Sequence, residues 1–159
     1  MKDVLQILEQ DARTTPEQIA AMTGHSVDEV RRIIGEAEAN RTIVRYRTVV
    51  NWEKAGEEQV WALIEVKVTP QRDVGFDSIA ERIARFPEVW SLSLASGGFD
   101  LSVMVVGRTM QEVSSFVSSK LAPLDPVQAT NTHFLLKRYK EDGVILEGDE
   151  QPHRLPIAP

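Results

Sequence analysis

The chain has 159 residues, of which 42% are hydrophobic and 26% are charged, and its formal net charge is −6. This composition is typical of folded globular proteins and argues against fibrous and wholly disordered classes. The lack of cysteine excludes disulfide frameworks, thiolate zinc sites and cysteine nucleophiles. The charged N-terminus has no signal-peptide core, and no segment approaches the roughly 18 apolar residues of a membrane span, so we expect a cytoplasmic protein without a membrane partner.

Three short helices are predicted at the N-terminus. Apolar residues at helical spacing predict the first helix over residues 3–11. A capping-box pattern at Thr15 begins a second helix over residues 16–22, and Gly24 is placed to take the left-handed conformation that ends it. A further capping box begins a third helix at Ser26. Two helices joined by a tight turn that contains glycine form the helix-turn-helix unit.

The segment after the third helix has a different pattern. Residues 41–50 alternate and are rich in β-branched side chains, so we expect a strand there, forming a wing beside the helix-turn-helix. Residues 51–58 break the alternation and are expected to be a linker. The expected DNA-binding domain therefore spans residues 1–50.

The rest of the chain has the order strand, helix, strand, strand, helix, strand. The strands are expected over Val60–Val68, Val89–Ala95, Leu101–Val106 and Ala129–Tyr139, and the helices over the apolar stripes of Phe76–Ile83 and Met110–Leu121. This order is the βαββαβ pattern of the ferredoxin-like fold, so we predict an α+β protein whose second domain spans residues 59–143. The helices leave one face of the sheet bare, and dimerisation through the sheets would bury it. Residues 144–159 are expected to form a flexible tail.

Several short motifs are informative through their order and spacing. They are Asp11-Ala12-Arg13, Ile19-Ala20, Ser26–Arg32, Ile43–Tyr46, Phe86–Val89, Ser96–Leu101 and Thr132–Lys137. Together they resemble the Lrp/AsnC family of transcription regulators over about residues 2–143. The resemblance implies a winged helix-turn-helix joined to a ferredoxin-like regulatory domain of the RAM type. It also implies homodimers that often assemble into octamers, and an amino acid or related effector bound where regulatory domains meet.

The predicted DNA interface centres on the third helix. In a helix-turn-helix the N-terminal residues of this helix enter the major groove of double-stranded DNA, and a two-fold dimer places two such helices about 34 Å apart. For Arg31 and Arg32 the alternative is a solvated helix face. The arginines of the following segment can contact phosphates along the DNA backbone. The residues expected to contact DNA are Ser26, Val27, Arg31, Arg32, Arg41, Arg45 and Arg47.

The predicted effector site centres on the loop between the second and third strands of the sheet. Its glycines permit close approach to backbone amides, and Asp100 can pair with an ammonium group. The alternatives are a tight hairpin in which Asp100 caps the turn, and threonines that satisfy the backbone of an edge strand. The residues expected to bind the effector are Ser96, Gly97, Gly98, Phe99, Asp100, Thr130 and Thr132.

Catalytic and metal sites find no support in the sequence. The three histidines are scattered, and we find no phosphate loop, nucleophile elbow or paired carboxylates. We therefore predict a transcription regulator with no cofactor and no enzymatic activity, whose assembly or DNA affinity responds to a small metabolite. Two alternatives stay open. One is an enzyme resembling sirohaem decarboxylases, with His133 as the candidate residue, and the other is a sensing module in which Asp28, Glu29 and Gly35 mark a decayed DNA-binding function.

Overall fold

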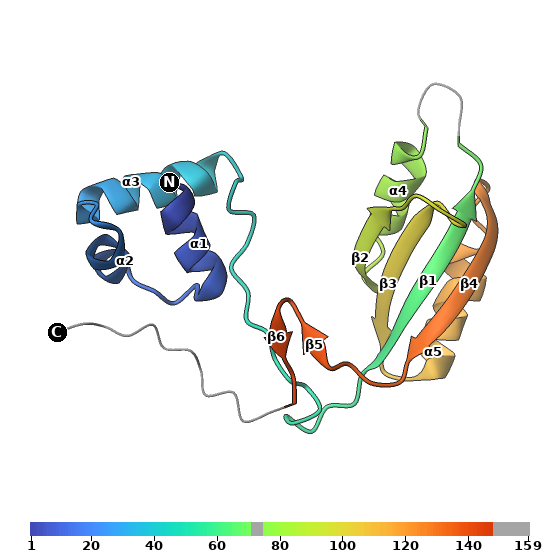
Figure 1. The fold of residues 1–159 in the computed structure, drawn as a ribbon. Coiled ribbons are helices and arrows are strands. Elements are labelled where there is room, and N and C mark those ends of the chain that lie inside the picture. Colours follow the sequence, from blue (N-terminus) through green and yellow to red (C-terminus); the bar gives the residue numbers. More distant parts are fainter. Residues whose placement is uncertain (71–74, 148–159) are drawn as a thin grey trace. The chain divides into compact units, whose positions relative to one another are not determined.

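A computed structural model describes residues 1–70 and 75–147, and these fall into two compact units, Met1–Val50 and Asn51–Glu147 (Figure 1). The first unit contains α1 (Lys2–Gln10), α2 (Pro16–Thr23) and α3 (Val27–Ala39). The second contains the strands β1 (Val60–Val68), β2 (Val89–Leu94), β3 (Leu101–Gly107) and β4 (Val127–Leu135), the helices α4 (Asp77–Ala84) and α5 (Met110–Phe116), and a hairpin of β5 (Lys140–Glu141) and β6 (Val144–Ile145). None of the described helices is long and apolar enough to cross a membrane.

Local hydrogen bonds define the ends of the helices in the first unit. Thr15 Oγ1 accepts from the Gln18 backbone N–H at 3.3 Å, and the Gln18 side chain accepts from the Thr15 N–H at 2.9 Å, which completes the predicted capping box of α2. Gly24 ends α2 with a φ of 76°, a conformation that glycine adopts at little cost. Ser26 Oγ accepts from the Glu29 N–H at 3.2 Å and begins α3. This is half of the second predicted box, because the Glu29 carboxylate is directed at a different partner.

Apolar side chains from all three helices form the core of the first unit. Its buried members are Val4, Leu8, Ile19, Ala20, Val30 and Ile33. Burial of each larger side chain contributes on the order of 1.5–3 kcal/mol to folding. The apolar side of α3 therefore packs against α1 and α2, and the opposite side of α3 is exposed to solvent.

The strand expected over residues 41–50 is absent from the structure. Arg41 has a φ of 62°, and the Ile43 N–H bonds to the last turn of α3 at 2.9 Å. The Tyr46 hydroxyl donates to the Glu38 carboxylate on α3 at 2.9 Å. The segment thus folds back on α3, whereas a strand needs a second strand to pair with. The strand prediction is wrong, because alternation in a sequence does not report whether such a partner exists.

The second unit has the predicted βαββαβ order. Its sheet is antiparallel throughout, in the order β2-β3-β1-β4, so that β1 and β3 are central (Figure 1). Alternate residues of these two strands pack against both helices. The core contains Ala62, Ile64, Val66, Leu101, Val103 and Val105 from the strands, with Ile79, Ile83, Val113 and Phe116 from α4 and α5. Both helices therefore cover the same face.

Some element boundaries differ from the prediction. β4 ends at Leu135 rather than at Tyr139. The helix expected to run through residue 121 changes at Val117 into a π-helical turn, where the Ala122 N–H bonds to the Val117 carbonyl at 2.8 Å. β6 lies within the region assigned to a tail, and the remainder of that region, residues 148–159, lies outside the described residues.

The sheet face away from the helices is apolar at one end and polar at the other. At the apolar end Trp61 and Trp90 meet edge to face, with ring centroids 5.3 Å apart, and the Arg138 guanidinium lies 4.1 Å from the Trp61 ring centroid. Further along β1 the same face carries Glu65 and Lys67. The expectation of a bare apolar face therefore holds at one end of the sheet and is wrong at the other.

Candidate DNA interface and small-molecule sites

The start of α3 combines capping and packing roles. The Ser26 hydroxyl is occupied as the N-cap, and the half-buried Val27 packs against the core of the first unit. Asp28 is the most exposed of these residues, with a side-chain exposure of 97%. Ser26 and Val27 thus fix the first turn of α3, and Asp28 is the residue of that turn that reaches solvent.

Arg31 and Arg32 project from the exposed stripe of α3. Arg31 Nη2 lies 2.6 Å from Glu17 Oε1 on α2, Arg32 Nη1 lies 2.8 Å from Glu36 Oε1, and both arginine side chains are 59% exposed. The Glu17 backbone N–H together with Arg31 lowers the pKa of the Glu17 carboxyl. Exposed pairs of this kind contribute little to stability. A DNA phosphate can therefore replace the carboxylate partners at low cost.

The remaining arginines proposed for DNA lie on the segment that follows α3. Arg41, Arg45 and Arg47 are all exposed, on irregular backbone rather than on a strand. The regular outward alternation expected for them is therefore not formed. Residues 1–50 contain seven Lys and Arg against eight Asp and Glu, so any attraction for DNA depends on local placement rather than on net charge.

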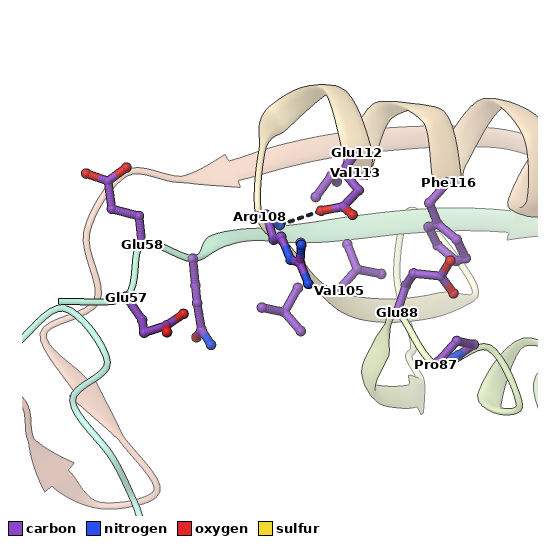
Figure 2. A pocket seen from close by; sticks show the side chains of 12 residues that line it. Glu57, Glu58, Pro87, Glu88, Val105, Arg108, Glu112, Val113 and Phe116 are labelled. Atoms are coloured by element: carbon purple, nitrogen blue, oxygen red, sulfur yellow. Dashed lines mark hydrogen bonds between the residues drawn. The ribbon is translucent and has the colours of Figure 1, made fainter. Parts of the chain in front are cut away.

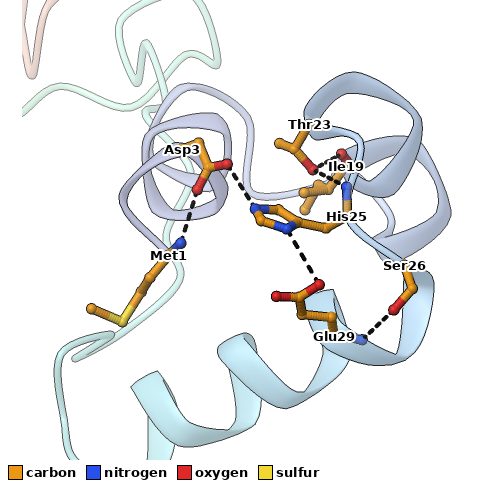
Figure 3. A network of polar contacts seen from close by, with 7 residues as sticks. All are labelled: Met1, Asp3, Ile19, Thr23, His25, Ser26 and Glu29. Atoms are coloured by element: carbon orange, nitrogen blue, oxygen red, sulfur yellow. Dashed lines mark hydrogen bonds and ion pairs between the residues drawn. The ribbon is translucent and has the colours of Figure 1, made fainter.

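A polar network at the helix-turn-helix turn was not predicted (Figure 3). His25 Nε2 lies 2.9 Å from Asp3 Oδ2 on α1, and His25 Nδ1 lies 3.4 Å from Glu29 Oε2 on α3. The four-residue spacing of His25 and Glu29 is a signal that the sequence offered. The partnership with Asp3 spans 22 residues and has no local signal.

Asp100 in the proposed effector loop has a structural role. Its Oδ2 accepts from the Val68 N–H at 2.9 Å, its Oδ1 lies 3.6 Å from Lys67 Nζ, and its side chain is 19% exposed. The carboxylate thus caps the end of β1 rather than the hairpin turn. Because Lys67 already lies beside it, Asp100 attracts the ammonium group of a ligand less strongly than an unpaired carboxylate would.

Substitution of Asp100 tests this capping role. We expect Asp100→Ala to lower the free energy of unfolding of the second unit by about 1–2 kcal/mol, because the Val68 N–H loses its acceptor. Asp100→Asn keeps an acceptor oxygen and should lose less than half as much. Urea denaturation of the two variants measures the difference, and equal losses would contradict the capping role.

The rest of the loop is open. Gly97 has a φ of 136°, and a Cβ built at either Gly97 or Gly98 would meet no atom within 4 Å. Ser96 is exposed and Phe99 is half buried. The loop therefore presents accessible backbone, and Gly97 requires glycine for its conformation.

The two threonines lie on β4, on the same face of the sheet as the helices. Thr130 is paired with Val66 of β1 and Thr132 with Ile64, and both threonines are half buried. The Asp100 N–H bonds to the Val66 carbonyl at 3.0 Å from the other side of β1. The structure thus brings the loop and Thr130 to the same end of the sheet, with β1 between them.

A pocket of about 380 Å³ lies at the opposite end of the sheet, where β3 ends (Figure 2). No sequence pattern indicated this pocket. Glu112 in this pocket accepts from the Arg108 N–H at 2.6 Å and so caps α5, while Glu88 pairs with Lys120. Partial burial alone would raise the pKa of the Glu88 carboxyl, but the hydrogen bond and charge of Lys120, together with the Glu88 backbone N–H, lower that pKa. Glu88 Oε2 is buried with no partner among the described residues.

The lining of the pocket mixes polar and apolar side chains. The lining includes Glu57 and Glu58 from the segment before β1, and Val105, Val113 and Phe116 from the domain core. Among residues 1–70 and 75–147, no three His, Asp or Glu side chains are arranged to hold a metal ion.

Sequence comparisons place the chain among known regulators. A model of the Lrp/AsnC ligand binding domain matches residues 61–145. The chain is 47% identical over 158 residues to a Bacillus subtilis (strain 168) protein named as the uncharacterized HTH-type transcriptional regulator YugG, covering 99% of this chain and 95% of that protein. It is 30% identical over 134 residues to an HTH-type transcriptional regulator of Pyrococcus furiosus, covering 84% of this chain and 88% of that protein.

Solved structures share the fold at lower identity. E. coli AsnC matches with a TM-score of 0.69 and 19% identity, covering 88% of this chain and 92% of that one. The feast or famine regulatory protein of M. tuberculosis complexed with L-methionine matches with a TM-score of 0.73 and 18% identity, covering 92% and 96%. A Neisseria meningitidis transcriptional regulator in complex with L-methionine matches with a TM-score of 0.71 and 23% identity, covering 87% and 89%. The resemblance found in the sequence is thus confirmed, and the chain belongs to the Lrp/AsnC family of HTH-type transcriptional regulators.

Proposed function

We propose that the protein acts in the cytoplasm as a sequence-specific DNA-binding regulator, that α3 is its recognition helix, and that it catalyses no reaction. The observation that carries this proposal is the exposed stripe of α3, on which Arg31 and Arg32 are held only by exposed carboxylates. Phosphate contacts by such arginines give affinity, and base contacts from the first turn give sequence choice.

The proposal includes a homodimer. Two copies related by a two-fold axis present two recognition helices about one DNA turn, roughly 34 Å, apart, so the preferred site is a near-palindrome. Trp90, which is 51% exposed at the apolar end of this sheet face, supports sheet-to-sheet association, whereas Trp61 beside it is already buried within the chain.

Selection from a random pool of DNA duplexes tests the proposal. The purified chain should enrich near-palindromic sequences with half-sites about 10 base pairs apart. No enrichment of any sequence, even at low salt, would instead favour a sensing module whose DNA-binding function has decayed.

We propose that the effector is an amino acid and that the backbone of the 96–100 loop binds it. Two structures of the same fold are complexes with L-methionine, and the glycines of this loop leave their backbone accessible. Because Asp100 is used as a cap, we assign the contact to backbone groups and not to its carboxylate. Effector binding would change assembly or DNA affinity by a coupling of about 1–3 kcal/mol.

Blocking the loop tests the effector proposal. We expect Gly98→Leu to weaken amino-acid binding at least about tenfold, because its side chain occupies the open space at the loop while the backbone needs no positive φ there. Gln111→Leu, on the exposed side of α5, is the matched control and should bind normally. Isothermal titration with each of the common amino acids measures both. Unchanged binding by Gly98→Leu would place the effector elsewhere.

The surroundings of His133 give the enzymatic alternative little support. His133 is 47% exposed, and its Nε2 lies 3.0 Å from Asn131 Nδ2 and 3.4 Å from Glu65 Oε2. These groups form a surface cluster on the bare sheet face rather than the lining of a pocket. Addition of sirohaem should leave its absorption spectrum unchanged, and a spectral shift followed by turnover would contradict the proposal of a non-enzyme.

A further inference from the structure

The turn that leads into the recognition helix holds a histidine between two carboxylates. His25 contacts Asp3 of α1 through Nε2 at 2.9 Å and Glu29 of α3 through Nδ1 at 3.4 Å (Figure 3). Its side chain is 28% exposed, which is less than that of either partner. One ring therefore joins the start of α1 to the first turn of α3.

The protonation state of the ring decides whether both contacts are favourable. A neutral imidazole has one donor and one acceptor nitrogen, whereas a carboxylate only accepts. If His25 is neutral, one of its nitrogens turns a lone pair toward a carboxylate oxygen. The doubly protonated ring donates to both, so the complete link between α1 and α3 needs the charged form.

The groups around the ring come from all three helices. From α1, the Asp3 carboxylate faces His25 and also binds the Met1 ammonium at 2.9 Å. That ammonium, the Val4 backbone N–H and His25 together hold the pKa of Asp3 far below its ordinary value, so Asp3 stays charged at neutral pH. From α2, Thr23 Oγ1 accepts from the His25 backbone N–H at 3.5 Å. From α3, Glu29 supplies the second carboxylate.

The link acts on the part of α3 that would meet DNA. Glu29 belongs to the turn capped by Ser26, so a displacement of the Glu29 side chain and its backbone moves the N-terminus of α3 relative to α1. We propose that His25 is a positioning residue for the recognition helix, whose protonated ring ties α3 to α1 and makes DNA affinity depend on pH. This inference rests on the proposed DNA-binding function.

The sign of the effect follows from the proton count. The tied arrangement binds one more proton than the untied one, so it is favoured at low pH and lost as pH rises. Exposed ion pairs are weak, and we therefore expect a loss of only about threefold in affinity between pH 6 and pH 8.

Binding of the full chain to its selected duplex, measured from pH 6 to pH 8, tests the link. The wild type should lose about threefold in affinity, while His25→Asn and Asp3→Asn should give flat profiles. His133→Asn removes a similarly partnered histidine in the second unit and is the matched control. Once light scattering shows that its state of assembly is unchanged, its pH profile should match that of the wild type. A flat wild-type profile would overturn the coupling. A profile that stays steep in Asp3→Asn would also overturn it, because the charge of His25 alone would then explain the effect.

Hydrogen exchange of the free protein separates this inference from DNA binding. After correction for intrinsic exchange, the amides in the first turn of α3 should be better protected at pH 6 than at pH 8 in the wild type, and equally protected in His25→Asn. Protection that does not respond to pH would overturn the link. The expected exchange pattern without DNA binding at any pH would support the link and overturn the proposed function instead.

Discussion

Ile64→Ala is expected to lower the free energy of unfolding of the second unit by about 3–4 kcal/mol. Ile64 is fully buried at the middle of β1, a central strand, where its side chain packs between the sheet and its two helices. Truncation removes apolar contacts and leaves a cavity that close-packed neighbours cannot fill. Few other single substitutions in this chain should have a larger effect on stability.

Urea denaturation followed by tryptophan fluorescence measures this loss. All three tryptophans, Trp52, Trp61 and Trp90, lie in the second unit, so the signal reports that unit alone. Ile145→Ala, at a position 45% exposed, is the matched control and should change stability by no more than about 0.5 kcal/mol. Protein concentration must be constant, since association adds to apparent stability. Equal losses in the two variants would contradict the core described above.

The double variant Arg31→Ala with Arg32→Ala is expected to weaken DNA binding at least about tenfold at moderate salt. Each arginine that leaves a phosphate should also reduce the slope of log affinity against log salt by about 1, so the double variant should lose about 2. Fluorescence anisotropy of a labelled duplex over a range of salt concentrations measures both quantities.

Two controls separate a DNA contact from a loss of folding. Glu17→Gln breaks the same ion pair as Arg31→Ala but keeps the guanidinium, so DNA binding should be retained or strengthened. Arg82→Ala with Arg85→Ala removes two arginines from the second unit and should leave affinity unchanged. If Glu17→Gln weakens binding as much as Arg31→Ala, the ion pair rather than the arginine is what matters.

The sequence was most informative where local interactions decide structure. The apolar run Val60–Val68 is ended by a proline two residues later, and the strand has those bounds. The Thr15 capping box and the left-handed Gly24 likewise formed as expected, because all of their partners lie within four residues. Helix order and strand order then fixed the βαββαβ arrangement.

Sequence patterns failed where a distant partner decides the outcome. Residues 41–50 have the composition of a strand, but Tyr46 and Ile43 are held by α3 instead. Asp100 was predicted to bind the ligand, but its carboxylate accepts a hydrogen bond from the backbone of Val68, 32 residues away, and caps β1 instead. Such contacts depend on which distant segments the fold brings together, and the periodicity of a sequence carries no information about that.

Among the residues at and near the recognition helix, those set by local spacing were placed correctly, and a contact with a distant partner was missed. Ser26 and Val27 were placed at the helix start correctly, yet the structure uses them for capping and packing. Arg31 and Arg32 lie on the exposed stripe, as helical spacing implies. His25 was overlooked, because the carboxylate of Asp3 lies 22 residues before it.

Directed cleavage of DNA is the most direct test of the central claim that α3 enters the major groove. The chain lacks cysteine, so Asp28→Cys supplies a single attachment point for an iron chelate at a side chain that is 97% exposed. If α3 enters the groove, the chelate should make two clusters of cuts within the selected site, about 10 base pairs apart, and the same chelate on Gln111→Cys in the second unit should make none. Cuts from the Gln111 position, or bound DNA left intact by the chelate on α3, would contradict this claim.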